Sequence, residues 1–111
     1  MKIDESLSFL RKDKKELLQK KIGSLTGGVE GLSHIILFGS YARGEEKATS
    51  DLDLLVLTEQ ELPRELRGGL SSEFEEANMD LVFYTVKQFK DSDCLLVSQI
   101  RKEGIVIWKQ K

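Results

Sequence analysis

The run LDLLVLT, residues 52–58, limits the possible folds of this chain more than any other stretch of its sequence. Nearly every position in it is apolar, so a strand formed here is buried on both faces, and we predict a central strand of a sheet. Two further runs rich in β-branched and aromatic residues, HIILFG at 34–39 and MDLVFYT at 79–85, predict additional strands. All three runs are too short to cross a bilayer, so no membrane contact is expected.

The segments between these runs have residue patterns that predict helices. Apolar residues at helical spacing predict an amphipathic N-terminal helix within residues 1–26, starting at about residue 5. Pro63 suits the start of a second helix, and residues 86–104 follow a third helical pattern with a glycine at its end. IVIW, residues 105–108, then predicts a short closing strand.

This order of elements predicts an α/β (α+β) fold, in which a mixed sheet of about four strands is flanked by helices. A chain of 111 residues has room for one hydrophobic core. We therefore expect a single domain over residues 1–111, in which the N-terminal helix precedes a core at 33–111 that holds any catalytic site.

The composition of the chain limits the binding partners and the cellular compartment that can be expected. With 17 basic and 19 acidic residues the net charge is −2, so the surface as a whole does not attract nucleic acid. The N-terminus lacks the apolar stretch of a secretory signal, so a cytoplasmic location is expected. The single cysteine, Cys94, excludes an internal disulfide and a thiolate zinc site, and the apolar run Leu95, Leu96 and Val97 beside it predicts that it is buried.

Three aspartates lie beside the apolar runs. Asp51 and Asp53 are separated by one residue, so on a strand they point to the same face. At about 6 Å and an effective dielectric constant of ~20, their repulsion is roughly 3 kcal/mol, which a bound cation would offset. Asp80 joins them if the second and third strands are neighbours. Three hard oxygen ligands suit Mg²⁺, which shares its coordination with substrate phosphates.

A turn at Gly39 and Ser40 ends the first strand. Glycine lets a ligand approach the backbone closely, and exposed N–H groups and the serine hydroxyl can hold phosphate oxygens. Such a turn and three carboxylates are together the equipment of metal-dependent phosphoryl or nucleotidyl transfer. Either feature alone is common, whereas the two in this order are far more specific.

The motifs GSYARG at 39–44 and SDLDL at 50–54 closely resemble the signature of the minimal nucleotidyltransferases of the DNA polymerase beta superfamily. The gap of ten residues between Ser40 and Asp51 matches as well. The third carboxylate lies where that family places its third metal ligand, and the closing EGIVIW resembles the last strand of many members.

This resemblance implies a role for each residue of the two motifs. Gly39 and Ser40 would hold the phosphates of the nucleotide. Arg43 would either touch the triphosphate or brace the loop. A centre that binds two Mg²⁺ ions and activates an acceptor hydroxyl would be formed by Asp51, Asp53 and Asp80.

The implied activity is that of a metal-dependent nucleotidyltransferase, which moves a nucleoside monophosphate onto a hydroxyl, with AMP from ATP as the expected case. In stand-alone members of the family the acceptor is commonly a tyrosine of a small helical HEPN-type toxin, and the transferase is its antitoxin. The alternative is a non-catalytic antitoxin or nucleotide-binding module that neutralises a partner by contact. A homo-oligomer also remains open.

Four other residues have less specific signals. Ser50 is expected to fix the loop through its hydroxyl, and Tyr41 to face solvent or nucleotide. The only histidine, His34, lacks partners at metal-ligand spacing, so a surface or packing role is expected. Trp108 ends the last strand and is expected to anchor the core or an interface.

Overall fold

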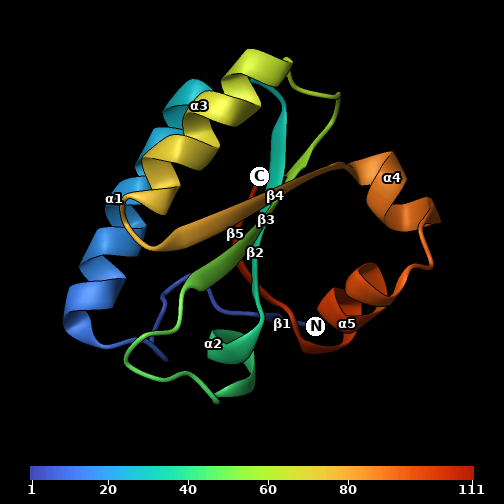
Figure 1. The fold of residues 1–111 in the computed structure, drawn as a ribbon. Coiled ribbons are helices and arrows are strands. Elements are labelled where there is room, and N and C mark those ends of the chain that lie inside the picture. Colours follow the sequence, from blue (N-terminus) through green and yellow to red (C-terminus); the bar gives the residue numbers. More distant parts are fainter.

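Five strands form one mixed sheet in the computed structural model, which describes residues 1–111 (Figure 1). In chain order they are β1 (Lys2–Ile3), β2 (Leu32–Phe38), β3 (Leu52–Thr58), β4 (Met79–Thr85) and β5 (Ile105–Lys109). Their order across the sheet is β1-β5-β2-β3-β4. β2 pairs antiparallel with β3 and β5, whereas β3 pairs in parallel with β4, and β1 with β5. The predicted α/β fold is confirmed, and β3 is an interior strand as expected.

Five helices accompany the sheet: α1 (Lys12–Gly28), α2 (Ser40–Arg43), α3 (Arg64–Glu75), α4 (Val86–Asp91) and α5 (Leu95–Glu103). α1 and α3 lie on one face of the sheet, and α4 and α5 lie on the other (Figure 1). The single turn of α2 lies at one end of the sheet, below the start of β3 in the same view. No helix has the length and apolar character needed to cross a membrane.

The two faces of the sheet are covered unequally. On the α1 and α3 face, 17 buried residues form one cluster around side chains such as Leu18, Leu54 and Phe74. The buried cluster on the α4 and α5 face has only 5 members, which are Ile36, Leu55, Leu57, Ile100 and Val106. α4 and α5 are short, with 6 and 9 residues, and the first part of β4 stays accessible. Helices therefore cover this face less completely near the start of β3 and β4.

The predicted start of the N-terminal helix is wrong, because α1 begins only at Lys12. The residues before it form a turn and β1, which adds a fifth strand to the expected four. β1 is held by long-range pairing with β5, as when the Lys2 N–H donates to the Gly104 carbonyl at 3.0 Å. Leu7 has a φ of 58°, which a right-handed helix excludes, and it is fully buried. Leu7 therefore reaches the core from a turn rather than from a helix.

The helical pattern at residues 86–104 is divided between two helices. α4 begins with a capping box, in which Thr85 and Gln88 exchange hydrogen bonds between side chain and backbone. It ends before Cys94, the residue that precedes the first turn of α5. The prediction that Cys94 is buried is wrong: it lies exposed in the break between the helices, and the apolar residues after it belong to α5.

Candidate functional site

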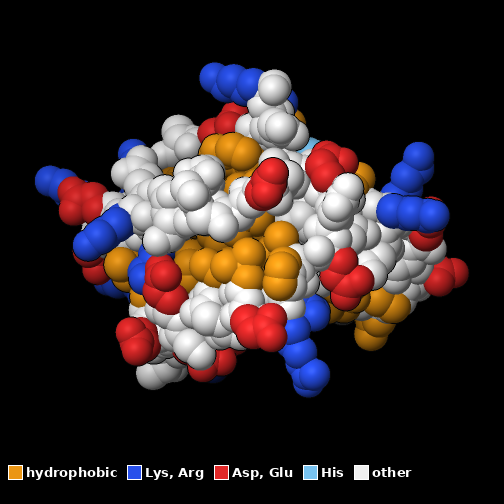
Figure 2. Space-filling view, turned by 90° about the horizontal axis from the view of Figure 1, so that it is seen from above, with side chains coloured by type: hydrophobic (Ala, Val, Ile, Leu, Met, Phe, Trp, Pro, Cys, Tyr) orange, Lys and Arg blue, Asp and Glu red, His pale blue; other side chains and the backbone are white.

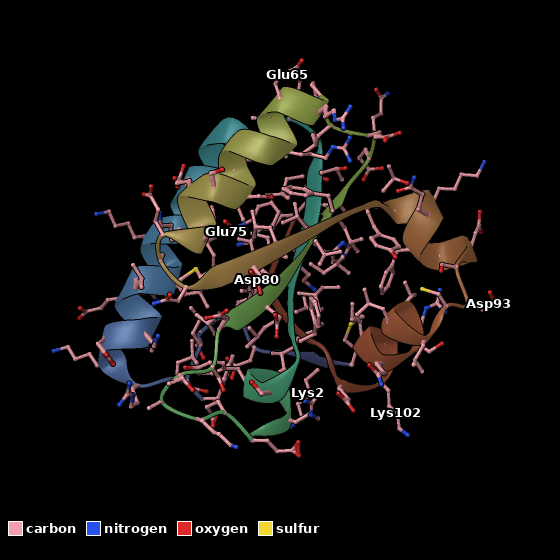
Figure 3. The ribbon with its side chains drawn as sticks, in the orientation of Figure 1. Lys2, Glu65, Glu75, Asp80, Asp93 and Lys102 are labelled. Atoms are coloured by element: carbon pink, nitrogen blue, oxygen red, sulfur yellow. The ribbon has the colours of Figure 1, made fainter.

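Two of the three predicted carboxylates lie side by side on parallel strands. Asp53 on β3 is paired with Asp80 on β4 in the register of the sheet, and Phe38 at the end of β2 is its partner on the other side. Leu55, two residues after Asp53, belongs to the cluster on the α4 and α5 face, so Asp53 points to that face as well. Figure 3 shows Asp80 near the start of β4, away from the helices that cover the far end of the strand.

Asp51 completes the group from just outside the sheet. It precedes β3 by one residue and is exposed, whereas Asp53 is half-buried. The pKa of the Asp53 carboxyl is raised above its ordinary value, mainly because burial removes water from it. The charge of Asp80 and then that of Asp51 raise this pKa further, while Arg43 lowers it. The three acids therefore concentrate negative charge that the chain itself only partly offsets.

Gly39 brings the backbone of the turn against this group. Its φ of 76° and ψ of −153° fall in a region open almost only to glycine. A Cβ atom built at this position would collide with the Asp53 carboxylate and lie 3.1 Å from its Cγ. The turn and the carboxylate are therefore in contact, so a ligand held by one also reaches the other.

Ser40 begins α2, and Arg43 ends it. The Arg43 guanidinium donates to Glu45 at 2.9 Å and to Glu103 on α5 at 3.2 Å. These two carboxylates hold the pKa of Arg43 above its ordinary value. Of the two roles expected for Arg43, bracing is the one present here, because it ties α2 to α5 while remaining near Asp53. Sequence reasoning missed Glu103, since nothing local links it to a residue 60 positions earlier.

The four residues with less specific sequence patterns mostly stabilise the fold. Ser50 accepts a hydrogen bond from the Lys47 N–H at 2.8 Å, which is the predicted loop-fixing role. Tyr41 was expected to face solvent or nucleotide, but it is buried in the larger core cluster. His34 is half-buried, with its Nδ1 atom 2.6 Å from the Ser33 hydroxyl, and has the expected packing role. Trp108 packs against the larger cluster, also as expected.

The opposite end of the sheet, away from the Gly39 turn, has an apolar and acidic surface. Figure 2 shows this end with apolar side chains gathered at its centre and acidic side chains around them. A hollow of about 530 Å³ there is lined by Glu30, Glu59 and Glu61 together with Leu62 and Pro63, and by no lysine or arginine. Phosphate groups would be repelled from such a hollow. The Gly39 turn also lies beside acids, but it adds backbone N–H groups and the nearby Arg43, so it is the better place for a nucleotide that arrives with a cation.

Asp51, Asp53 and Asp80 fit a divalent cation by their chemistry. Their side chains do not converge on one point as a finished metal site. They do supply hard oxygen ligands, and the pKa of Asp53 is raised first by burial and then by the charges of Asp80 and Asp51, which Arg43 only partly offsets. Mg²⁺ is commonly bound by one or two carboxylates and completes its shell with water and substrate phosphates, so a preformed cage is not required.

Comparison with known proteins points to one family. A family model described as "Polymerase beta, Nucleotidyltransferase" matches residues 20–111. The candidate protein adenylyltransferase MJ1215 of Methanocaldococcus jannaschii is 46% identical over 55 residues, which cover 49% of this chain and 52% of that protein. The chain therefore spans about half the length of the curated relatives that it matches.

Two solved structures of related complexes are also similar. A toxin–antitoxin crystal structure with AMP-PNP contains a chain that is 28% identical, with a TM-score of 0.66 over 84% of this chain and 74% of that one. A structure of the tri-AMPylated Shewanella oneidensis HEPN toxin with its MNT antitoxin gives 25% identity and a TM-score of 0.59, over 86% of this chain and 72% of that one.

Proposed function

Because the chain belongs to the polymerase beta nucleotidyltransferase family, we propose that it is a metal-dependent nucleotidyltransferase that moves AMP from ATP onto a protein hydroxyl. The main support is the pairing of Asp53 with Asp80 in contact with the Gly39 turn. This pairing puts cation ligands and a phosphate-binding turn within reach of one nucleotide.

Each residue of the proposed site has its own role in the reaction. The Gly39 backbone and the Ser40 hydroxyl hold the phosphates, and Arg43 fixes the turn through its two carboxylate partners. Two Mg²⁺ ions would be held by Asp51, Asp53 and Asp80. When bound, such ions neutralise negative charge on the attacking and leaving oxygens of a phosphoryl transfer.

The proposed reaction is a single displacement at the α-phosphorus of ATP. The acceptor oxygen forms a bond to that phosphorus, the bond to the oxygen that bridges the α- and β-phosphates breaks, and pyrophosphate leaves. Asp80 is the exposed member of the paired carboxylates and accepts the proton of the acceptor hydroxyl. Asp53 is half-buried and fixed between β2 and β4, which suits a ligand rather than a proton shuttle.

The acceptor in this proposal is a tyrosine of a small helical HEPN-type protein, for which the chain is the antitoxin. Similarity to chains of toxin–antitoxin complexes, one with an AMPylated HEPN toxin, supports it. Exposure of Asp51 and Asp80 also supports it, because a site on an open surface admits a side chain of another protein. Such a reaction needs ATP, so the proposal includes a cytoplasmic location.

A transfer assay tests this function. The purified chain, Mg²⁺ and a co-encoded helical partner are incubated with α-labelled ATP, GTP, CTP or UTP in turn. We expect label from ATP on the partner, lost in Asp80→Asn and retained in Asp93→Asn, which removes an exposed charge at the distant break between α4 and α5 (Figure 3).

The outcomes separate the possible functions. Label from another nucleotide would keep the reaction type and change the donor. No label from any nucleotide, together with tight binding of the partner, would refute the transferase and favour a contact-only antitoxin.

A further inference from the structure

β4 is an edge strand with little of the usual protection. Natural edge strands are kept from pairing by shortness, by lysine or proline, or by bulges. β4 has 7 residues, MDLVFYT, no irregularity in its register with β3, and one charged residue, Asp80. The residues that follow Asp80 in the strand are all only half-buried. In Figure 1 β4 is the strand nearest the viewer, and no element covers its outer edge.

The free backbone groups of β4 have a defined position. In a parallel ladder, alternate residues direct both backbone groups to the neighbouring strand. The Leu52 N–H of β3 donates to the Asn78 carbonyl, so the even-numbered residues of this segment face β3. Leu81 and Phe83 therefore direct their N–H and C=O groups outward, whereas the outward N–H of Thr85 is already taken by Gln88.

Charge differs between the two ends of this edge. Exposed acids lie at the entry to β4, namely Glu75 and Glu76 at the end of α3 and Asp80 in the strand itself (Figure 3). At the exit, the exposed Lys87 in the first turn of α4 and the half-buried Arg67 of α3 outnumber the one nearby acid, Glu61. If β4 of a second chain pairs antiparallel with this β4, the acidic entry of each strand lies against the basic exit of the other, which gives two favourable contacts. Parallel pairing would instead bring like charges together.

From these observations we propose that β4 pairs with β4 of a second copy of this chain, antiparallel and about a two-fold axis at Val82. The two sheets then form one continuous sheet. In this register Leu81 and Phe83 of each copy exchange their free backbone hydrogen bonds with Phe83 and Leu81 of the other.

Other registers fit less well. An axis at Leu81 brings the two Asp80 residues close to each other, whereas an axis at Val82 keeps them four positions apart along the strands, or about 13 Å. An axis at Phe83 needs the N–H of Thr85, which Gln88 already occupies. Only the Val82 axis uses the free groups and avoids the repulsion.

The dimer has a consequence for the carboxylate group. With the axis at Val82, Tyr84 of the second copy lies directly opposite Asp80 on the same face of the joined sheet. This is also the face to which Asp53 points. In the dimer, each carboxylate group is therefore flanked by the Tyr84 side chain of the other copy, which a single chain does not place there.

A cross-linking experiment tests the register. At the two-fold axis the Cα atoms of the two Val82 residues are about 4.5 Å apart, within the range that a disulfide spans. In a Cys94→Ser background, which removes the exposed native thiol, Val82→Cys is oxidised by dissolved oxygen with a copper catalyst. We expect a covalent dimer in high yield, and only background cross-linking for Gln99→Cys at an exposed position on α5.

A charge exchange tests the antiparallel arrangement without altering the strand. Lys87→Glu is expected to raise the dimer dissociation constant about tenfold in sedimentation equilibrium, since it brings like charges together. Adding Glu76→Lys to the same chain is expected to restore the dimer. Lys102→Glu, an exposed position on α5, makes the same change in net charge away from β4 and should have no effect (Figure 3).

Three results would contradict a dimer through β4. A wild-type chain that stays monomeric at every concentration overturns the proposal and leaves the β4 edge for an extended segment of another protein. Equal cross-linking of the Val82→Cys and Gln99→Cys variants, or equal effects of Lys87→Glu and Lys102→Glu, also overturns it. None of these measurements depends on transferase activity, so they leave the proposed function untouched.

Discussion

At the scale of single residues, Asp53 combines the features that matter most for this protein. It is half-buried, paired with Asp80 across the strands and in contact with Gly39. Burial and two neighbouring acids disfavour its ionised form. A group held against its electrostatic preference is typical of binding and catalytic sites, where a ligand supplies the missing charge.

Asp53→Asn is expected to stabilise the metal-free fold by about 1 kcal/mol at neutral pH, after allowance for solvent screening of the charges. Because the pKa of Asp53 is raised in the folded state, the ionised carboxylate lowers stability at pH values above that pKa. The advantage of the variant should disappear as pH falls below ~3.9, the value in unfolded chains. Thermal unfolding from neutral to acidic pH measures this, and a lower melting temperature of Asp53→Asn at pH 7 would contradict it.

Gly39→Ala is expected to destabilise the fold by about 2 kcal/mol or more, from backbone strain and from collision with the Asp53 carboxylate. Gly44→Ala is the control for a positive φ without a collision: Gly44 has a φ of 71° and a ψ of 24°, in the left-handed region that other residues adopt at lower cost, and an added Cβ meets nothing within 4 Å. It should cost only about 1 kcal/mol. Urea unfolding gives both values. Equal losses in the two variants would show that contact with Asp53 adds nothing.

At the scale of elements, four of the five strands were predictable, whereas β1 and the ends of the helices were not. β2, β3 and β4 coincide with apolar runs, because a strand buried between neighbours has a local signature. β1 has none, since it consists of Lys2 and Ile3 and is held by distant β5. The same limit explains Cys94, whose exposure depends on where α4 ends rather than on its apolar neighbours.

α1 contains a glycine that the fold does not need. An added Cβ at Gly23 meets nothing within 4 Å, so Gly23→Ala is expected to raise the free energy of unfolding by about 1 kcal/mol through helix propensity. Gly104→Ala should instead destabilise the fold, because its Cβ would lie 2.5 Å from the Ile100 carbonyl oxygen and 2.8 Å from Ile36. Chemical denaturation compares the two, and a loss of stability in Gly23→Ala would contradict the account of α1.

At the scale of the whole molecule, the unequal cover of the sheet positions the site. The α1 and α3 face holds most of the core, so the other face can stay partly open where β3 and β4 begin. The order Gly39, Ser40, Asp51, Asp53 in the sequence is what locates the proposed site. The pairing of Asp53 with Asp80 depended on two strands being neighbours, which the sequence left as a condition.

The melting temperature should respond to Mg²⁺ through this one site. Ligands that bind only the folded state stabilise it, so Mg²⁺ with AMP-PNP is expected to raise the melting temperature of the wild type. The rise should be lost in Asp53→Asn and kept in Asp93→Asn. Thermal unfolding with and without Mg²⁺ and AMP-PNP measures this. An equal rise in the melting temperature of both variants would mean that the ligand binds elsewhere.

The most direct test of the carboxylate centre is a crystal structure of the chain with Mn²⁺ and AMP-PNP, with the metal located by its anomalous scattering. We predict two anomalous peaks between the carboxylates of Asp51, Asp53 and Asp80, with the nucleotide phosphates against Gly39 and Ser40. Clear nucleotide density with no metal at these aspartates, or a nucleotide at the opposite end of the sheet, would contradict the proposed site.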